Sequence, residues 1–184
     1  MRRARNRRSK SPPLVFLVLL VLGLLLIGYI DQTLREIHAA DGSLVLVRDG
    51  DSLVIDRAEL RLYGIDAPEL RQTCADAKGE PWRCGEAAKS ALNQIVSRGG
   101  LRCSPRARDR FGREVATCRV NGLDDVGAAM LRDGFAVVFG TAPDGDYQSA
   151  ETGARVAKRG IWQGGFMPPS EWRHQHPRPD GGHD

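Results

Sequence analysis

The run of residues 47–69, VRDGDSLVIDRAELRLYGIDAPE, constrains the fold more than any other part of this chain. It begins with residues 49–51, a turn-forming group, because Asp and Gly tolerate tight turn geometry. Residues 52–55 and 59–65 then alternate as two strands around a polar turn, which predicts a β-hairpin. Pro68 ends the second strand, since it has no backbone N–H to donate to a sheet.

A hairpin returns its far end beside its start, so this one brings acidic side chains together. We expect Asp66 to lie near Asp51, with Arg61 and Glu69 around them. Two neighbouring carboxylates repel each other unless a cation lies between them, and oxygen ligands favour a hard ion such as calcium or magnesium. A guanidinium beside such a pair suits a phosphate, which it can bind through two N–H groups.

A cation, an arginine and a further carboxylate are the groups that phosphodiester hydrolysis requires. The alternative is that residues 49–51 form an ordinary surface turn, while Arg61 and Glu69 form an exposed salt bridge. The presence of the whole set within one short run favours hydrolysis over that alternative.

The chain resembles the staphylococcal nuclease (thermonuclease) family at several spaced motifs. The family has a DGD-type turn, an arginine strand and a D-x-P-E segment, followed later by an aromatic-Gly-Arg turn and a Gly-aliphatic-Trp signature. The resemblance is specific because these motifs occur here in the same order. They correspond to residues 49–51, Arg61, residues 66–69, residues 109–113 and residues 160–162, within a similarity that spans about residues 43–162.

This resemblance implies a calcium-dependent endonuclease that acts on DNA, RNA or both, and we expect a monomer. It implies that calcium is held by the carboxylates of Asp51 and Asp66 and by the backbone carbonyl of Ala67. It also implies that Glu69 is the general base for the attacking water, and that Arg61 and Arg113 hold the phosphate. The alternative function is a catalytically inactive OB-type module that binds nucleic acid or protein and is tethered to a membrane.

The net charge of +4 does not indicate a basic face on the folded domain. Residues 1–13 hold six of the 27 Lys and Arg residues and no acidic residue, so 21 basic residues remain against 23 Asp and Glu. The positive excess therefore belongs to the leader. Attraction of a polyanion to the domain would depend on local arginines, such as those between Arg102 and Arg113.

Residues 14–30 form an uninterrupted apolar run of seventeen residues, near the lower limit for a membrane span. With the basic residues before it, this predicts a single-pass anchor in the inner membrane, with the N-terminus cytoplasmic and the domain periplasmic or extracellular. A cleaved signal peptide, which would give a secreted domain, stays open, although only Ala39-Ala40 offers a suitable cleavage site. If the anchor is not cleaved, residues 31–42 would be a short stalk.

The four cysteines all follow the apolar run, and their number is even. Cys103 and Cys118 flank the arginine-rich turn almost symmetrically, while Cys74 and Cys84 bracket a short loop containing Gly and Pro. We predict the disulfides Cys74–Cys84 and Cys103–Cys118, hence an oxidising compartment. A zinc site would need C-x-x-C spacing or a nearby histidine, and buried free thiols are the other alternative.

The remaining helices and strands do not follow the regular strand–helix alternation of a parallel α/β sheet. They predict an α+β domain at residues 43–166, a small closed antiparallel barrel of OB type with about three helices, and a flexible tail at 167–184. Helices are predicted at residues 85–97 and 147–159, with a third that is capped by Asp124 or Asp125 and runs to about Arg132. The further predicted strands are residues 43–47, 101–104, 115–120 and 135–139.

Overall fold

The structure, a computed structural model, describes residues 13–34, 37–38, 43–140 and 145–177. The chain forms two compact units, Met1–Arg35 and Glu36–Asp184. The first contains helix α1 (Pro13–Leu34), whose side chains from Val15 to Ile30 are almost all exposed.

The predicted membrane anchor over residues 14–30 is not supported. Within the described ranges, no helix is both long enough and apolar enough to cross a membrane. The predicted leader lies outside the described residues, apart from Pro13.

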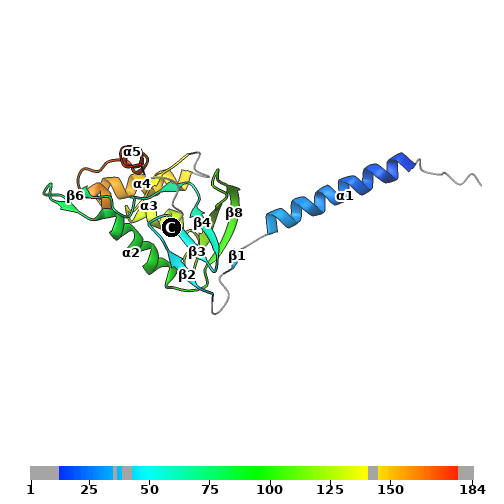
Figure 1. The fold of residues 1–184 in the computed structure, drawn as a ribbon, viewed down its shortest axis with the longest axis horizontal. Helices are drawn as coiled ribbons and strands as arrows, with labels where there is room; N and C mark the ends of the chain where they lie inside the picture. The colour runs from blue at the N-terminus through cyan, green and yellow to red at the C-terminus, as the bar shows by residue number, and fades with distance from the viewer. Residues whose placement is uncertain (1–12, 35–36, 39–42, 141–144, 178–184) are drawn as a thin grey trace, which may run out of the picture. The chain divides into compact units, whose positions relative to one another are not determined.

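The second unit is built on a six-stranded sheet with the strand order β1-β8-β9-β4-β3-β2 (Figure 1). Neighbouring strands are antiparallel except for β4 and β9, which run parallel, with Arg61 opposite Val115. The strands are β1 (Ile37–His38), β2 (Val45–Val47), β3 (Ser52–Ile55), β4 (Ala58–Leu62), β8 (Arg102–Arg108) and β9 (Glu114–Arg119).

The structure confirms the mixed α+β class but not the closed antiparallel barrel. Among the described strands, β1 and β2 are the two edges of the large sheet and do not pair with each other. The parallel β4–β9 pair also breaks the antiparallel pattern, because the chain leaves the sheet after β4 and returns through α2. Strand β1 lies within residues 31–42, which the sequence predicted to be a stalk, yet it pairs with β8.

Two small sheets complete the strand set. Strand β5 (Ile65–Asp66) pairs with β10 (Val137–Val138), so that Asp66 lies opposite Val137. Strand β6 (Cys74–Ala75) pairs with β7 (Pro81–Trp82). The β5–β10 pair matters for the site because it fixes the backbone that carries Asp66.

The helices of the second unit are buried to different extents: α2 buries one face, whereas residues 126–131 of α3 are all buried. In α2, the residues Ala88, Leu92 and Ile95 recur at helical spacing and are buried. The N-terminus of α3 is capped by Asp125, whose carboxylate accepts a hydrogen bond from the Ala128 N–H at 2.9 Å. The helices are α2 (Cys84–Val96), α3 (Val126–Arg132), α4 (Gly145–Val156), the 3-10 turn η1 (Gly160–Gln163) and α5 (Pro169–Gln175).

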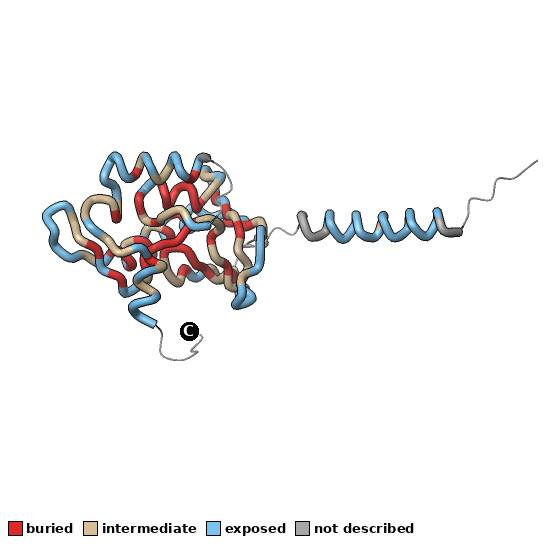
Figure 2. Tube along the Cα trace, turned by 90° about the horizontal axis from the view of Figure 1, so that it is seen from above, coloured by how far each residue is buried: buried red, intermediate tan, exposed pale blue. Residues whose placement is uncertain are grey.

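The core lies between the large sheet and these helices, where Figure 2 shows the buried segments gathered in the interior of the second unit. Leu53 and Leu60 from the hairpin, Leu92 from α2, and Met130 and Leu131 from α3 are fully buried. Each such side chain contributes about 1.5–3 kcal/mol relative to an exposed one. The predicted hairpin is therefore a central part of the core, and its polar face is held rigidly by its apolar face.

Both predicted disulfides are confirmed. Cys103 and Cys118 are direct register partners on β8 and β9, with their Cα atoms 4.1 Å apart. Cys74 of β6 is joined to Cys84, the first residue of α2. The described part of the chain has no free cysteine. These thiols therefore serve as crosslinks, and the alternatives of a zinc site and of buried free thiols are both wrong.

A flexible tail was predicted for residues 167–184, but the first part of this segment contains a helix. Residues 167–177 are described and include helix α5, which carries Pro169 at its first position. Proline suits that position, because its missing N–H would have had no partner within the helix. The consequence for the site is large, since α5 supplies a side chain that reaches the carboxylates.

Candidate active site

The turn at residues 49–51 holds Asp51 at the start of β3. One carboxylate oxygen of Asp49 accepts hydrogen bonds from the N–H groups of Asp51, at 3.1 Å, and Ser52, at 2.8 Å. Asp49 thus shapes the turn that the sequence predicted at residues 49–51. A Cβ on Gly50 would lie 2.7 Å from the Cβ atoms of Ala67 and Ala88, so glycine permits close packing against these neighbours.

The central observation is that Asp51 and Asp66 converge on one nitrogen atom. Arg61 lies on β4 opposite Ser52, and its Nη2 atom is 2.8 Å from both Asp51 Oδ2 and Asp66 Oδ1. The predicted proximity of these three residues is therefore present in the structure. The cation between the two carboxylates is the guanidinium of Arg61.

The two carboxylates are almost completely inaccessible to water. Asp51 is 4% exposed and Asp66 is 1% exposed. Burial raises the pKa of Asp51 to about 8, although the neighbouring Arg61 acts in the opposite direction. The Ala67 N–H also donates a hydrogen bond to Asp51 Oδ2 at 3.1 Å. An ionised carboxylate in such surroundings is costly unless positive charge compensates it.

Arg61 stays charged in this environment. Burial acts to lower its pKa, but Asp51 and Asp66 outweigh that effect and hold the pKa above its ordinary value. A guanidinium that is fixed in place and permanently positive can stabilise negative charge that develops beside it.

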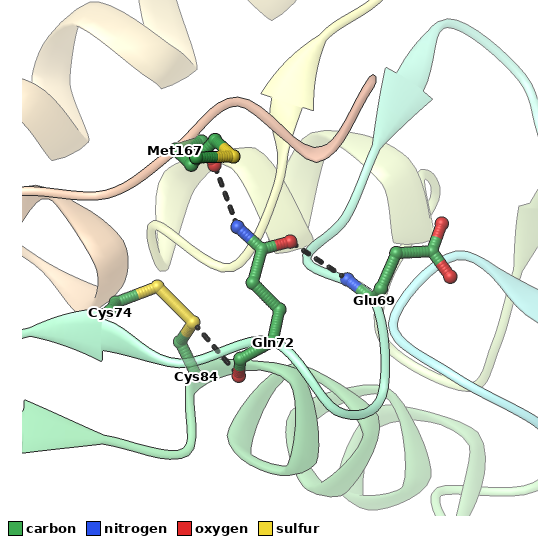
Figure 3. Close-up of a disulfide and its surroundings, with 5 residues drawn as sticks. All are labelled: Glu69, Gln72, Cys74, Cys84 and Met167. Atoms are coloured by element: carbon green, nitrogen blue, oxygen red, sulfur yellow. Dashed lines mark hydrogen bonds between the residues drawn. A yellow bond between two sulfur atoms is a disulfide. The ribbon is translucent and has the colours of Figure 1, made fainter. Parts of the chain in front are cut away.

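Glu69 lies in the loop just after β5, between Pro68 and the start of the disulfide region. Its N–H donates to Gln72 Oε1 at 3.2 Å (Figure 3), and its side chain is 15% exposed. Helix α2 approaches this loop closely, because a Cβ on Gly85 would lie 1.8 Å from the Glu69 carbonyl oxygen. The Glu69 carboxylate therefore belongs to a rigid loop beside the Asp pair.

Arg173 of α5 is a member of this site that sequence reasoning missed. Its Nη1 is 2.8 Å from Asp66 Oδ1 and 2.9 Å from Glu69 Oε1, and its Nη2 is 2.9 Å from Asp66 Oδ2. Hydrogen bonding to Asp66 raises the pKa of Arg173 above its usual range, against the effect of burial. No motif marks this residue, and the contact joins positions 107 apart in the chain.

Arg113 lies on the turn between β8 and β9, and its polar contacts within the described residues are to other groups. Its Nε donates to Asp109 Oδ2 at 2.8 Å, and its Nη1 is 3.9 Å from Glu59 Oε1. Its guanidinium carbon is 5.5 Å from the centre of the exposed Phe111 ring. Because β9 runs beside β4, Arg113 is next to Glu59, two residues before Arg61. A role for Arg113 at the phosphate stays a prediction.

The oxygen donors of the site fit a hard divalent cation in kind. The carboxylates of Asp51 and Asp66 converge on one positive group, and the Ala67 backbone adjoins them. The described residues contain no group of three or more His, Cys, Asp or Glu side chains in a metal-binding arrangement. Arg61 and Arg173 instead provide the positive charge that these carboxylates require.

A family model described as "Staphylococcal nuclease homologue" matches residues 59–164. The chain is 40% identical over 119 residues to "Succinoglycan biosynthesis protein ExoI" of Rhizobium meliloti (strain 1021), which covers 64% of this chain and 62% of that protein. It is 33% identical over 135 residues to "Probable endonuclease LCL3" of Paracoccidioides brasiliensis (strain Pb03), covering 63% and 38%.

A further relative is "Probable staphylococcal-like nuclease CAN2" of Oryza sativa subsp. japonica, which is 28% identical over 145 residues. That alignment covers 78% of this chain and 36% of the relative. The chain thus matches less than two thirds of the length of each of these three relatives. The family match contains Arg61, Asp66 and Glu69, whereas Asp51 lies before it and Arg173 after it.

Proposed function

Since this chain belongs to the staphylococcal nuclease homologue family, we propose that it is a calcium-dependent endonuclease that hydrolyses phosphodiester bonds of DNA, RNA or both. The observation that supports this most is the convergence of Asp51 and Asp66 on Arg61, with Glu69 beside them. Two of the relatives are named as a probable endonuclease and a probable nuclease, which agrees with this proposal.

The proposed cation ligands are the carboxylates of Asp51 and Asp66 and the backbone carbonyl of Ala67. When bound, a calcium ion supplies positive charge beside the scissile phosphate. The cation also offsets the cost of keeping two ionised carboxylates out of water.

Arg61 donates hydrogen bonds to the phosphate oxygens and offsets the negative charge that grows in the transition state. It can do so because its backbone lies on β4 and its guanidinium is held in place by Asp51 and Asp66. If Asp51 and Asp66 held a cation, its charge would compensate theirs, and the N–H groups of Arg61 would then be available to the substrate. Arg113, on the neighbouring strand, is the proposed second arginine.

Glu69 is the proposed general base. Its carboxylate accepts a proton from the attacking water, which must lie within hydrogen-bond distance of a carboxylate oxygen. The backbone hydrogen bond to Gln72 fixes the loop from which this side chain extends. Because Arg173 pairs with the same carboxylate, the base becomes available only when that contact is released or shared.

A second candidate is a binding module without catalytic activity. The observation that favours it is that arginines pair with all three carboxylates in the described structure. One relative is also named for a role in succinoglycan biosynthesis, which is not a nuclease name. This candidate predicts nucleic-acid or protein binding with no turnover.

The test is nuclease activity of the full chain on labelled single- and double-stranded DNA and on RNA, with calcium and with chelator. The proposal expects cleavage with calcium, none with chelator, and a loss on the order of a hundredfold or more in Glu69→Gln. The control is Arg155→Ala, which changes an exposed arginine that is paired with Glu151. This variant is expected to keep the activity of wild type. If wild type and Glu69→Gln were equally inert with calcium, magnesium and manganese, the binding module would be the better account.

The two disulfides support a location in an oxidising compartment outside the cytoplasm. This proposal is tested by trapping thiols in intact cells with an alkylating reagent and counting the modified cysteines by mass spectrometry. Protection of all four cysteines is expected, whereas full alkylation would contradict it.

A further inference from the structure

Arg173 comes from a part of the chain that the family match does not include. The match ends at residue 164, whereas α5 begins at Pro169. The Arg173 side chain is 34% exposed, and its two partner carboxylates are 1% and 15% exposed. The arginine therefore approaches the buried carboxylates from the solvent side.

Arg173 uses the oxygen atoms that the proposed cation would need. It binds both oxygens of Asp66 and one oxygen of Glu69, at 2.8–2.9 Å. An Asp66 oxygen that ligates a divalent cation cannot keep a full charge-assisted hydrogen bond from a guanidinium on the same lone pairs. Two positive groups at one carboxylate also repel each other. Occupancy by one therefore disfavours occupancy by the other.

The segment that leads into α5 is attached to the loop of Glu69 by one buried side chain. Gln72 is fully buried, and its Nε2 donates to the Met167 carbonyl oxygen at 2.6 Å (Figure 3). Its Oε1 accepts from the Glu69 N–H, and its own carbonyl oxygen accepts from the Gly85 N–H at 3.2 Å, beside the disulfide. Gln72 thus connects the Glu69 loop, α2 and the C-terminal segment.

Helix α5 is well suited to open and close on this attachment. It has seven residues, too few to be stable without tertiary contacts. Within α5 only Pro169 is buried, whereas Glu171, His174 and Gln175 are exposed. Few side chains of this helix therefore pack against the domain beyond Pro169 and Arg173. Segments with few buried contacts open at low free-energy cost.

We propose that Arg173 is a competing counter-ion of the site, which must release Asp66 and Glu69 before a divalent cation is held there. This inference rests on the proposed function, because it requires the same cation site. Cation binding and the docking of α5 through Arg173 are then coupled equilibria. The cation shifts α5 towards its undocked state, and docked α5 lowers the affinity for the cation by the same factor. In the closed state the protein keeps its buried carboxylates neutralised without a metal.

The test is calcium binding by titration calorimetry on the full chain, which requires no turnover. Arg173→Ala is expected to bind calcium more tightly than wild type, on the order of tenfold, within the range typical of coupled sites. Arg173→Lys keeps the charge but loses the two-pronged contact, so a smaller gain is expected. Arg83→Ala removes an equal charge from an exposed pair with Glu86 and is expected to leave the affinity unchanged.

Hydrogen exchange gives a second readout in wild type. The amides of α5 are expected to exchange faster with calcium than with chelator, whereas those of α4 are expected to stay unchanged. If Arg173→Ala fails to fold, the Arg173→Lys titration and the exchange experiment still decide the matter.

Equal or weaker calcium binding by a folded Arg173→Ala would overturn the competition. Slower exchange of α5 with calcium would overturn it as well. If neither wild type nor any variant bound calcium while wild type still cleaved nucleic acid with another metal, the competition with calcium and the calcium dependence would both fail, but the assignment as a nuclease would stand. If wild type neither bound a divalent cation nor cleaved, both proposals would fail.

Discussion

The β3–β4 hairpin and the β8–β9 hairpin each present an arginine to acidic partners, but they do so in different surroundings. The side chains of Arg61 and Arg113 are similarly accessible, at 21% and 23%. Arg61 pairs with Asp51 and Asp66, whose side chains are 6% and 1% exposed. The side chain of Asp109, beside Arg113, is 18% exposed. From this difference we expect the burial of the partner carboxylate, more than that of the arginine, to decide how much each pair contributes to stability.

The physical reason is the environment of the carboxylate. A buried carboxylate that loses its partner keeps its desolvation penalty, whereas a more accessible one recovers water and is screened by salt. The first hairpin therefore depends on its ion pairs, and the second depends on its strand pairing and its disulfide.

The largest expected effect is that of Arg61→Ala. It removes the group that joins Asp51 to Asp66, so we expect a loss of about 3–5 kcal/mol in the free energy of unfolding. Arg113→Ala, the matched change in the other hairpin, should cost about 1 kcal/mol or less. Urea denaturation of both variants measures this, and equal losses would remove the basis of the comparison.

Removal of the disulfide between β8 and β9 should have the next largest effect. Cys103 and Cys118 are 15 residues apart, and closing a loop of that length contributes about 3 kcal/mol in the chain-entropy model. We expect the double variant Cys103→Ala with Cys118→Ala to lose about that amount in thermal or urea unfolding. Reducing agent added to the variant serves as the control for the remaining Cys74–Cys84 bond. A loss below about 1 kcal/mol would mean that the strand pairing alone holds this hairpin.

The two hairpins should also respond to pH with opposite signs. The folded protein keeps the Asp51 proton up to about pH 8, whereas the ordinary value is 3.8. The stability from Asp51 is therefore fully present below pH 3.8 and is lost as the pH rises towards 8.

Asp109 behaves in the opposite way. Burial acts to raise its pKa, but hydrogen bonds from Arg113 and from backbone N–H groups lower it overall. Its stability contribution is present above the ordinary pKa of 3.8 and is lost as the pH falls through the lower folded value. Unfolding measured from pH 3 to 9 in chelator, for wild type, Asp51→Asn and Asp109→Asn, separates the two. Parallel curves for wild type and Asp51→Asn would contradict the effect of Asp51.

The smallest expected effect is that of Arg108→Ala, which removes a pair with Glu114 on the exposed part of the second hairpin. Exposed pairs of this kind contribute about 0–1 kcal/mol. We therefore expect a change in stability within about 0.5 kcal/mol by urea denaturation. A larger loss would mean that accessible pairs on this hairpin matter more than the comparison allows.

Much of the segment that carries Asp51, Arg61 and Asp66 could be predicted because its determinants are local. Turn residues and alternating apolar side chains act within a few positions of each other. The same applies to the cap of α3 by Asp125 and to the disulfide that joins neighbouring strands of one hairpin. In each case the interacting residues are close in the chain.

The wrong prediction of a closed barrel could not be corrected from the sequence alone. Whether a sheet closes depends on which distant strands pair. The parallel pairing of β4 with β9 joins residues more than fifty positions apart, as in Arg61 and Val115. Strand patterns state which face of a strand is apolar, but they do not state its partner or its direction.

The sequence by itself determined that Asp51, Arg61, Asp66 and Glu69 would lie close together, since short-range turn and strand preferences act within residues 49–69. Only the tertiary structure decided how that negative charge is neutralised. Arg173 reaches Asp66 and Glu69 from a helix 107 and 104 residues further on. Such a contact depends on how the packed domain positions the C-terminal segment, and local residue patterns carry no information about it.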